Sequence, residues 1–275
     1  MAVPKRVGIV GYGNLGKFLS SHVLSSDCYE LAFIWNRSLS VLGDFPDQEL
    51  ILKDLRHFAE RRAELIVEVA HPDIILEYGA AFLEKSDLMI GSPTALADAN
   101  LLERLRQKSY GSGHEILIPS GAFWGGEDIK KMADRGTLKS LKVTMKKHPS
   151  SYKLVHPLSE KNEAILKSGG AAMLFQGPVK DICPLAPNNV NTMAAAALAG
   201  HNLGFTGVQG CLVADCRLSD CHIVEVEVEG SNGFNVHTVR KNPAALAAVT
   251  GQATYASFWS SLQAVISRGP GVHLC

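Results

Sequence analysis

The sequence predicts an α/β protein in which an N-terminal Rossmann domain, a doubly wound parallel sheet, is followed by a second α+β domain built on a mixed sheet. Three observations predict this fold. An apolar strand pattern at residues 7–10 runs directly into a glycine-rich turn and a helical pattern. Strand and helix patterns then alternate as far as residue 119. Beyond residue 136 the chain contains strand patterns with alternating apolar and polar residues, and a glycine-rich stretch between two of them predicts a hairpin.

The glycine-rich turn is Gly11-Tyr12-Gly13-Asn14-Leu15-Gly16, which fits the pattern G-x-G-x-x-G of dinucleotide-binding proteins. Gly11 permits the tight turn, Gly13 lets the backbone approach a pyrophosphate, and Gly16 lets the helix pack close to the strand. The helix N-terminus then offers free N–H groups to the phosphates. A glycine turn in an ordinary α/β protein is the alternative, but the strand before it and the helix after it favour a cofactor site.

The second strand, at residues 30–35, ends in Asn36-Arg37. A site that prefers NAD usually has an acid here, which bonds the ribose 2′-hydroxyl. A neutral amide does not repel a 2′-phosphate and a guanidinium pairs with one, so we expect NADP, or dual use, rather than strict NAD. The alternative is that Arg37 is a solvated loop residue.

The rest of the first domain continues the alternation. Further strands are predicted at 65–70, 88–92 and 115–119, and helices at 73–84 and 95–108. His71 follows the first of these strands, where it either lines the nicotinamide pocket or shapes the turn before Pro72.

The second domain begins with a helix at 127–135 that stops at Gly136. Strands are expected at 138–147, 208–214, 223–229 and 234–239, the last two joined by a hairpin at 230–233. A final helix, at about 249–268 and including Val265 and Ile266, is expected to pack back onto the first domain. We therefore assign 1–120 plus about 241–275 to the dinucleotide-binding domain and 121–240 to the substrate domain.

Two stretches of the second domain carry candidate chemistry. Asn188, Asn189 and Asn191 precede an alanine-rich helix, where one asparagine serves as an N-cap and an extra carboxamide can bond a nicotinamide or a substrate. His222 opens a strand on the same face as Val224. It is either a buried structural histidine or a pocket histidine suited to proton transfer, oriented by Asp215 or Asp220. The sequence leaves both alternatives open.

Composition excludes several function classes. The 275 residues hold 27 Lys plus Arg and 27 Asp plus Glu, so no net charge attracts nucleic acid or a membrane surface. No signal peptide and no membrane-spanning run is recognisable. The six cysteines show no CxxC spacing, so we expect reduced thiols, no metal site and a cytoplasmic protein.

In these features the chain resembles the L-aspartate dehydrogenase family, including its animal domain-containing members. The matching pieces are Gly11–Gly16, Val67-Glu68-Val69-Ala70-His71-Pro72, Ser120-Gly121-Ala122 followed by Gly125-Gly126, Asn189-Val190-Asn191, and Ala214-Asp215 leading to His222. The resemblance implies oxidation of L-aspartate by NAD(P)⁺ to iminoaspartate, which water converts to oxaloacetate and ammonia. It places the active-site histidine at His222 and cofactor contacts at Ala122 and Asn189.

The chain departs from the family pattern at two places. Asn36-Arg37 stands where prokaryotic members carry an acid, which bears on the nucleotide. Lys146-Lys147-His148-Pro149 replaces a segment like Arg-Lys-Pro-Pro, which bears on the substrate. An aspartate-like substrate brings two carboxylates, so we name Lys147 as the candidate cation, with Asn191 as a second substrate contact. A solvated strand end is the alternative for Lys147.

Other functions remain as alternatives at this point. They are a dehydrogenase for another small amino acid and a non-catalytic NADP-binding sensor or scaffold. A phosphorylating aldehyde dehydrogenase needs a nucleophilic cysteine where this chain has Ser120-Gly121-Ala122, and a dihydrodipicolinate reductase would show paired histidines. An apolar sheet face in the second domain predicts a homodimer.

Overall fold

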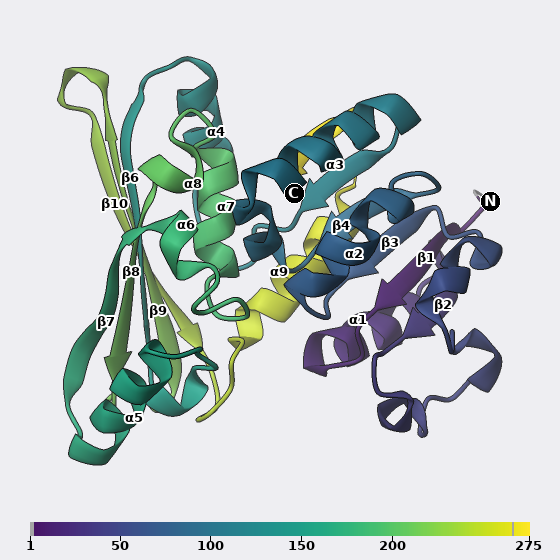
Figure 1. Ribbon diagram of the computed structural model, residues 1–275, viewed down its shortest axis with the longest axis horizontal. Coiled ribbons are helices and arrows are strands. Elements are labelled where there is room, and N and C mark those ends of the chain that lie inside the picture. The colour runs from purple at the N-terminus through teal and green to yellow at the C-terminus, as the bar shows by residue number, and fades with distance from the viewer. Residues whose placement is uncertain (1–2, 266) are drawn as a thin grey trace.

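The computed structural model describes residues 3–265 and 267–275 and contains two sheets, each with its own helices (Figure 1). The first sheet has six parallel strands in the order β11-β5-β4-β3-β1-β2. Its strands are β1 (Lys5–Val10), β2 (Tyr29–Trp35), β3 (Leu65–Glu68), β4 (Asp87–Ile90), β5 (Glu115–Ile118) and β11 (Gly271–Leu274). This is the predicted doubly wound parallel sheet.

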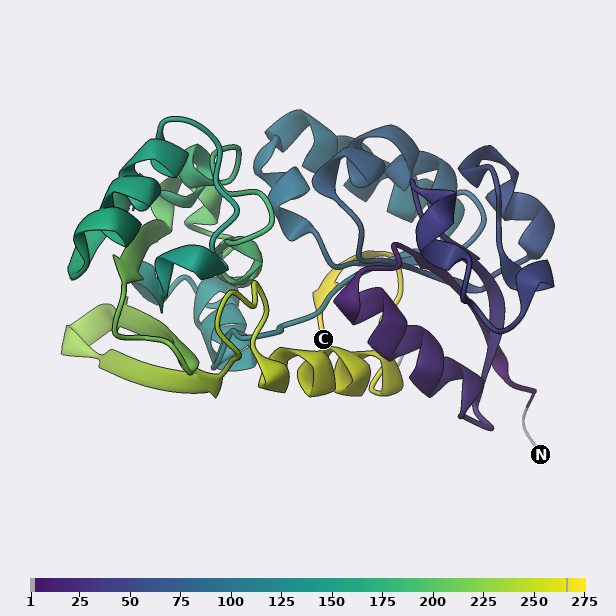
Figure 2. The same ribbon diagram turned by 90° about the horizontal axis from the view of Figure 1, so that it is seen from below.

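Helices cover both faces of the first sheet, so its central strands are buried along their length. On one face α2 (Pro72–Phe82) and α3 (Ala99–Ser112) pack through Ile75, Phe82 and Leu105. On the other face lie α1 (Asn14–Leu24) and α9 (Gln252–Gln263), side by side in Figure 2. The carboxyl ends of the strands are thereby left as the open edge where ligands bind in such sheets.

The second sheet is mixed, as predicted, with the strand order β10-β9-β6-β8-β7. Strands β6 and β8 are parallel, and the other pairs are antiparallel. The strands are β6 (Leu138–Lys147), β7 (Ala171–Pro178), β8 (Gln209–Asp215), β9 (Cys221–Gly230) and β10 (Asn235–Pro243). The predicted hairpin joins β9 to β10.

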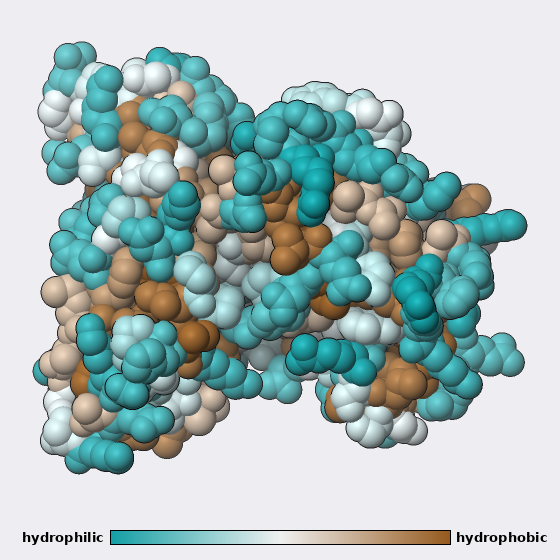
Figure 3. Space-filling model, in the orientation of Figure 1, coloured by the Kyte–Doolittle hydropathy of each residue, from teal (hydrophilic) through white to brown (hydrophobic). Residues whose placement is uncertain are grey.

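Helices cover one face of the second sheet and lie between it and the first sheet, and no helix of residues 3–265 and 267–275 covers the other face (Figures 1 and 2). They are α4 (Gly126–Asp134), α5 (Leu158–Ser168), α6 (Val179–Ile182), α7 (Asn191–Ala199) and α8 (Gly204–Gly207). Short 3₁₀ turns lie at Leu39–Leu42, Gln48–Leu50, Leu55–Arg61, Pro93–Ala97, Pro149–Ser151 and Ser231–Gly233. In the space-filling view the outline narrows between the two lobes (Figure 3).

The prediction of one long final helix at 249–268 is wrong at both ends. The helix begins only at Gln252, because Gly251 is extended with ψ 151°. It ends at Gln263, and Ile266 lies outside the described residues. The expected packing onto the first domain is confirmed, since the Tyr29 hydroxyl donates to the carbonyl oxygen of Leu262 at 3.2 Å.

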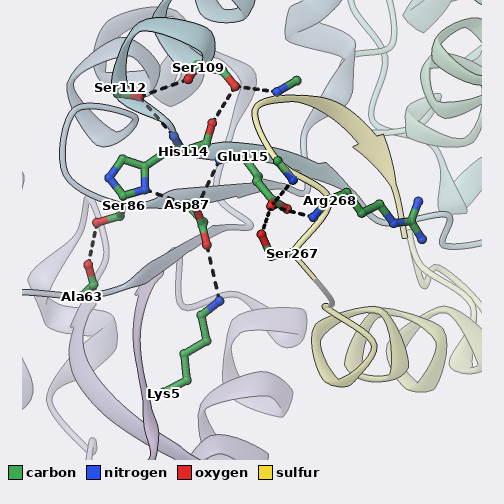
Figure 4. A network of polar contacts seen from close by, with 12 residues as sticks. Lys5, Ala63, Ser86, Asp87, Ser109, Ser112, His114, Glu115, Ser267 and Arg268 are labelled. Carbon is green, nitrogen blue, oxygen red and sulfur yellow. Dashed lines mark hydrogen bonds and ion pairs between the residues drawn. The ribbon is translucent and has the colours of Figure 1, made fainter.

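A buried carboxylate accounts for the strand that follows α9. Glu115 Oε1 accepts hydrogen bonds from Ser267 Oγ, Arg268 N and Gly269 N at 2.6, 2.7 and 2.8 Å (Figure 4). These bonds turn the chain so that β11 pairs with β5. The last residue then accepts from Ser120 N at 2.8 Å, so the C-terminus supports the loop after β5.

The helix predicted at 95–108 also has different bounds. A 3₁₀ turn at Pro93–Ala97 comes first, and α3 starts at Ala99 because the Asp98 side chain accepts from Asn100 N and Leu101 N. No helix among residues 3–265 and 267–275 combines the length and the apolarity needed to cross a membrane.

Candidate functional site

The glycine turn forms what we call the cofactor cradle, together with the ends of β2 and β3. Gly11 has φ 116°, and a Cβ there would lie 2.8 Å from the backbone of Val69. A Cβ on Gly16 would lie 2.0 Å from the carbonyl oxygen of Gly11, whereas one on Gly13 would meet nothing within 4 Å. The open space at Gly13 is where a pyrophosphate needs the backbone to be bare.

The first turn of α1 is equally prepared for an anion. No side chain caps it and it contains no acidic residue, so its N–H groups remain available to a phosphate. Asn14 is exposed and Leu15 is half-buried at the start of this helix. The residues of the cradle therefore fit a dinucleotide.

Asn36 holds the shape of the cradle. Its Oδ1 accepts from Tyr12 N, and its Nδ2 donates to the carbonyl oxygen of Ser38, both at 3.0 Å. Tyr12 itself turns inward and packs edge-on against Phe45. Arg37 is exposed on the rim of the hollow that Gly11 and Gly13 also line.

Glu68, at the end of β3, is fully buried beside the cradle. Its Oε1 accepts from Ala70 N, His71 N and Ser92 Oγ, and its Oε2 accepts from Ser92 N. Burial raises the pKa of Glu68 to about 7, although these four bonds favour the carboxylate. The side chain fixes the turn after β3 against the end of β4.

His71 shapes that same turn, which is the second of the two roles considered for it. Its Nδ1 accepts from Asp73 N at 3.3 Å and caps α2. The ring also borders the cradle.

A second hollow, which we call the substrate cavity, lies between β6, β9, the loop after β5 and the start of α9. It brings together five of the predicted site residues: Ala122, Lys147, Asn189, Asn191 and His222. The other lining residues are Met145, Asn188, Thr192, Val224, Asn242, Val249, Thr250, Gly251 and Thr254. None of these lining residues is acidic.

His222 is only 4% exposed, and its Nε2 has no hydrogen-bond partner in the part of the chain that the structure describes. The predicted orientation of the ring by Asp215 or Asp220 is wrong, because Asp215 pairs with Arg217 at 2.8 Å and the backbone of Ala248 bonds the ring instead. Burial, and then the charge of Lys147, lower the pKa of His222 to about 4, against the opposing bond to Ala248. The imidazole is therefore neutral at pH 7, and one of its nitrogens is buried without a partner among residues 3–265 and 267–275.

Lys147 is 4% exposed, so the alternative of a solvated strand end is wrong. Its Nζ donates to the carbonyl oxygen of Val249 at 2.8 Å and lies 5.6 Å from the centre of the Tyr152 ring. No carboxylate compensates its charge among the residues described, and burial lowers its pKa to about 8. A buried amine without an acid is a favourable place for a ligand's carboxylate.

The asparagines before α7 do not act as the predicted N-cap. Val190 occupies the cap position and no side chain caps the helix. Asn189 is buried, accepting from Lys153 N at 2.8 Å and donating to the carbonyl oxygen of Ser151 at 3.3 Å. Asn191 begins the helix, and its buried Oδ1 has no hydrogen-bond partner among the described residues.

Sequence reasoning named Lys147 but not its burial, and it assigned no role to Glu68, Thr250 or Gly251. The alternation of side chains along β6 could have predicted that Lys147 is buried, since Lys147 lies on the same face of the sheet as Val143 and Met145. Glu68 stood out as the one acid in an apolar strand run. Thr250 and Gly251 carried no signal, because they belong to the region predicted as helix.

The six cysteines are all free. No group of three His, Cys, Asp or Glu side chains in residues 3–265 and 267–275 lies close enough to hold a metal ion.

Comparison with known proteins identifies the family to which this chain belongs. Residues 11–119 match the family model for the homoserine dehydrogenase NAD-binding domain, and residues 128–261 match that for the aspartate dehydrogenase C-terminal domain. Aspartate dehydrogenase domain-containing proteins of Xenopus tropicalis and Danio rerio are each 49% identical, with 98% of both chains covered. The chain belongs to the aspartate dehydrogenase family. It is therefore an oxidoreductase with an NAD-binding domain.

More distant members agree with this membership. An L-aspartate dehydrogenase of Methanococcoides burtonii is 26% identical over 87% of this chain and 89% of its own. The crystal structure of aspartate dehydrogenase from Thermotoga maritima has the same fold, with a TM-score of 0.72, 22% identity, and coverage of 97% of this chain and 98% of that chain.

Proposed function

We propose that this member of the aspartate dehydrogenase family oxidises L-aspartate with NADP⁺ or NAD⁺, giving iminoaspartate and then oxaloacetate and ammonia, or catalyses the reverse reductive amination. The observation that carries the proposal is the substrate cavity. It combines a neutral imidazole, a buried lysine and no acidic side chain. Such a set suits an anionic amino acid that must lose a proton.

The cofactor cradle would hold the dinucleotide. The backbone from Gly11 to Gly16 would bind the pyrophosphate, and Asn36 and Arg37 would bind the adenosine ribose. Ala122 and Asn189 would contact the nicotinamide. When bound, the nicotinamide ring accepts the hydride that leaves the α-carbon of the substrate.

His222 moves the protons of the reaction in this proposal. Its free Nε2 accepts a proton from the substrate amine, or from the water that attacks the imine carbon, and later returns it. The bond to Ala248 holds the ring in place during both steps. Lys147 and Asn191 bind the polar groups of the substrate, and the side chains of Met145 and Val224 form the apolar part of the cavity wall.

The experiment is a panel of amino acids with each nucleotide, following the absorbance of the reduced cofactor. We expect L-aspartate to be oxidised, and His222→Ala to lower kcat about 10² to 10⁴-fold, as loss of a general acid/base does, while cofactor affinity is kept. Near wild-type turnover by His222→Ala would contradict the assignment. Cofactor binding without turnover of any amino acid would favour a sensor or scaffold, and turnover of a different amino acid would name another substrate.

We also propose a homodimer formed through the face of the second sheet that carries no helix. Val239 and Met173 lie on the two edge strands of this sheet and are 61% and 57% exposed, and a second copy of the chain would cover them. A sedimentation mass near twice the 29.6 kDa of the chain is expected, and a mass near one chain would contradict the proposal.

A further inference from the structure

A further cavity of ligand size lies between α4 and the hairpin that joins β9 to β10. We call it the hairpin cavity, and its volume of about 380 Å³ falls within the range of about 300–1,000 Å³ that is typical of small-molecule sites. It shares no lining residue with the substrate cavity or with the hollow of the cofactor cradle. Helix α4 and the hairpin lie at the end of the second sheet that is remote from α5 (Figure 1). The hairpin cavity is therefore a separate candidate site.

Much of the lining of the hairpin cavity is apolar. Val226 and Val228 of β9 line it. Their partners across the antiparallel pair, Thr238 and Val236 of β10, line it as well. Helix α4 contributes Ile129, which is buried. An apolar body that enters the cavity therefore removes apolar area from water, which is favourable.

Two aromatic side chains that line the cavity are largely exposed. Trp124 is 63% exposed and Phe234 is 50% exposed. Trp124 lies just before the start of α4, whereas Phe234 lies at the hairpin, where a Cβ on Gly230 would meet both Phe234 and Met132. Aromatic pairs gain stability beyond the area that they bury, so a ligand with an aromatic ring suits this lining.

Helix α4 gives the hairpin cavity an acidic end and a basic end. Asp128 lies in the first turn of the helix, and Lys131 and Arg135 follow it on the same side. At a rise of 1.5 Å per residue, the backbone positions of Asp128 and Arg135 are about 10 Å apart. Lys130 pairs with Asp134, whereas Lys131 and Arg135 have no ion-pair partner in the part of the chain that the structure describes. An anionic group of a ligand would complement the basic end.

A buried hydroxyl points independently to a polar group at the other end of the ligand. Thr238 Oγ1 is buried and has no hydrogen-bond partner within residues 3–265 and 267–275. Arg240, two residues further along β10, donates to the carbonyl oxygen of Gly121 at 3.1 Å, in the loop that leads into α4. Thr238 and the acidic first turn of α4 therefore lie toward the same end of the cavity. A buried hydroxyl without a partner is destabilising, and a donor on a ligand would satisfy it.

We propose that the hairpin cavity binds a phenolic acid, an aromatic carboxylate whose ring carries a hydroxyl at the end opposite the carboxylate. The carboxylate pairs with Lys131 and Arg135, and the ring packs against Trp124 and Phe234. The phenol donates its hydrogen bond to Thr238 Oγ1. An aliphatic acid would leave the aromatic contacts unused, and an acid without the hydroxyl would leave Thr238 without a partner.

The position of the hairpin cavity keeps it independent of the other proposals. Val226 and Val228 lie on the face of the second sheet that the helices cover, so a dimer through the opposite face leaves the cavity open. No residue of the cavity takes part in the proposed chemistry. Binding can therefore be measured whether or not the chain oxidises L-aspartate.

The test measures binding of para-coumarate to the full chain by calorimetry, with two analogues that each lack one group. Cinnamate lacks the hydroxyl, and we expect it to bind about threefold to tenfold more weakly, the scale of one hydrogen bond. The primary amide of para-coumarate lacks the charge, and we expect it to bind about threefold or more weakly, the scale of exposed ion pairs.

Variants of the chain locate the two ends of the ligand. Thr238→Val keeps the shape of the side chain and removes the hydroxyl, so para-coumarate and cinnamate should bind it equally. Arg135→Glu should weaken both acids about fivefold or more, because it reverses a charge at the basic end. Lys161→Glu, an equal change of charge at an exposed position of α5, is the matched control and should keep wild-type affinity. Thermal unfolding of each variant checks that the fold is kept.

Several outcomes would overturn the proposal. They are equal binding of para-coumarate and cinnamate by the wild type, no binding of either acid, and a preference for para-coumarate that Thr238→Val retains. Equal affinity of Arg135→Glu and Lys161→Glu would also overturn it. An acid held at Lys147 in the substrate cavity would respond to neither Thr238→Val nor Arg135→Glu, so the two sites are distinguished.

Discussion

A buried ionisable side chain lies beside the cofactor cradle and another lines the substrate cavity, and the two differ in how many hydrogen bonds the protein gives them. Glu68 beside the cradle accepts four hydrogen bonds. Lys147 in the cavity has one carbonyl and the face of a ring. The first group is satisfied by the protein alone, whereas the second is satisfied only when a ligand brings a negative charge.

This difference separates a structural residue from a functional one by its partners rather than by its burial. A buried charge with a complete set of bonds holds a turn in place. A buried charge without them lowers stability, and such a residue is kept where function requires it. The predictions below test this distinction on both residues.

Lys147→Met should give the largest change in stability. Removing a lysine whose pKa falls from 10.5 to about 8 is expected to raise the free energy of unfolding at pH 7 by up to about 3 kcal/mol. The adjacent Lys146 pairs with Glu225 on the other face of the sheet, so Lys146→Met is the control and should change stability by less than about 1 kcal/mol. Urea unfolding measures both, and a destabilised Lys147→Met would show that the amine is structural.

The same variant predicts a pH dependence with a definite sign. Between pH 8 and 10.5 the unfolded chain keeps the Lys147 proton that the folded chain releases, so the stability of the wild type rises with pH in this window. The difference in unfolding free energy between Lys147→Met and the wild type should therefore decrease from pH 8 upward and be absent by pH 10.5. An advantage that stays constant over this range would mean that the folded lysine is not desolvated.

Glu68→Gln should lower the free energy of unfolding, and by less than Lys147→Met raises it. All the groups that face Glu68 are donors, so the amide of a glutamine would oppose the N–H of Ser92. We expect a loss of about 2 kcal/mol in unfolding free energy, the scale of a buried donor left unpaired, and weaker dinucleotide binding. Glu64→Gln, exposed just before the same strand, should change either quantity little. Unchanged stability in Glu68→Gln would contradict the view that the hydrogen bonds of Glu68 stabilise the fold whereas the buried Lys147 destabilises it.

The two regions also differ in how far the sequence predicts them. The cradle depends on backbone geometry, and glycine spacing reports this directly, so Gly11 to Gly16 could be located from sequence. The residues that line the cavity come from six separate segments of the chain, and its position depends on the register of the second sheet. Periodicity correctly placed His222 on the apolar face of β9, but its partner Ala248 lies outside every element that the sequence predicts.

Elements at the margins were missed for local reasons. Strand β7, at the edge of the second sheet, is exposed over much of its length and lacks alternation. Strand β11 forms because Glu115, far away in the sequence, captures the backbone after α9. The residues of β7 and β11 therefore do not by themselves predict these strands.

Arg37→Ala should have the smallest effect and is confined to the cradle. The exposed guanidinium stands on the rim of the hollow that the glycine turn lines, where it can pair with a 2′-phosphate. We expect NADP⁺ affinity to fall about fivefold to tenfold, or about 1 kcal/mol, as for a solvent-exposed ion pair. NAD⁺ affinity in the same variant is the internal control and should stay constant, because NAD⁺ lacks that phosphate. Equal losses for both nucleotides would assign Arg37 to the shape of the turn, and no loss for either would make it a solvated loop residue. The stability of the fold should not change in any of these cases, because an exposed side chain on this rim takes part in neither buried network.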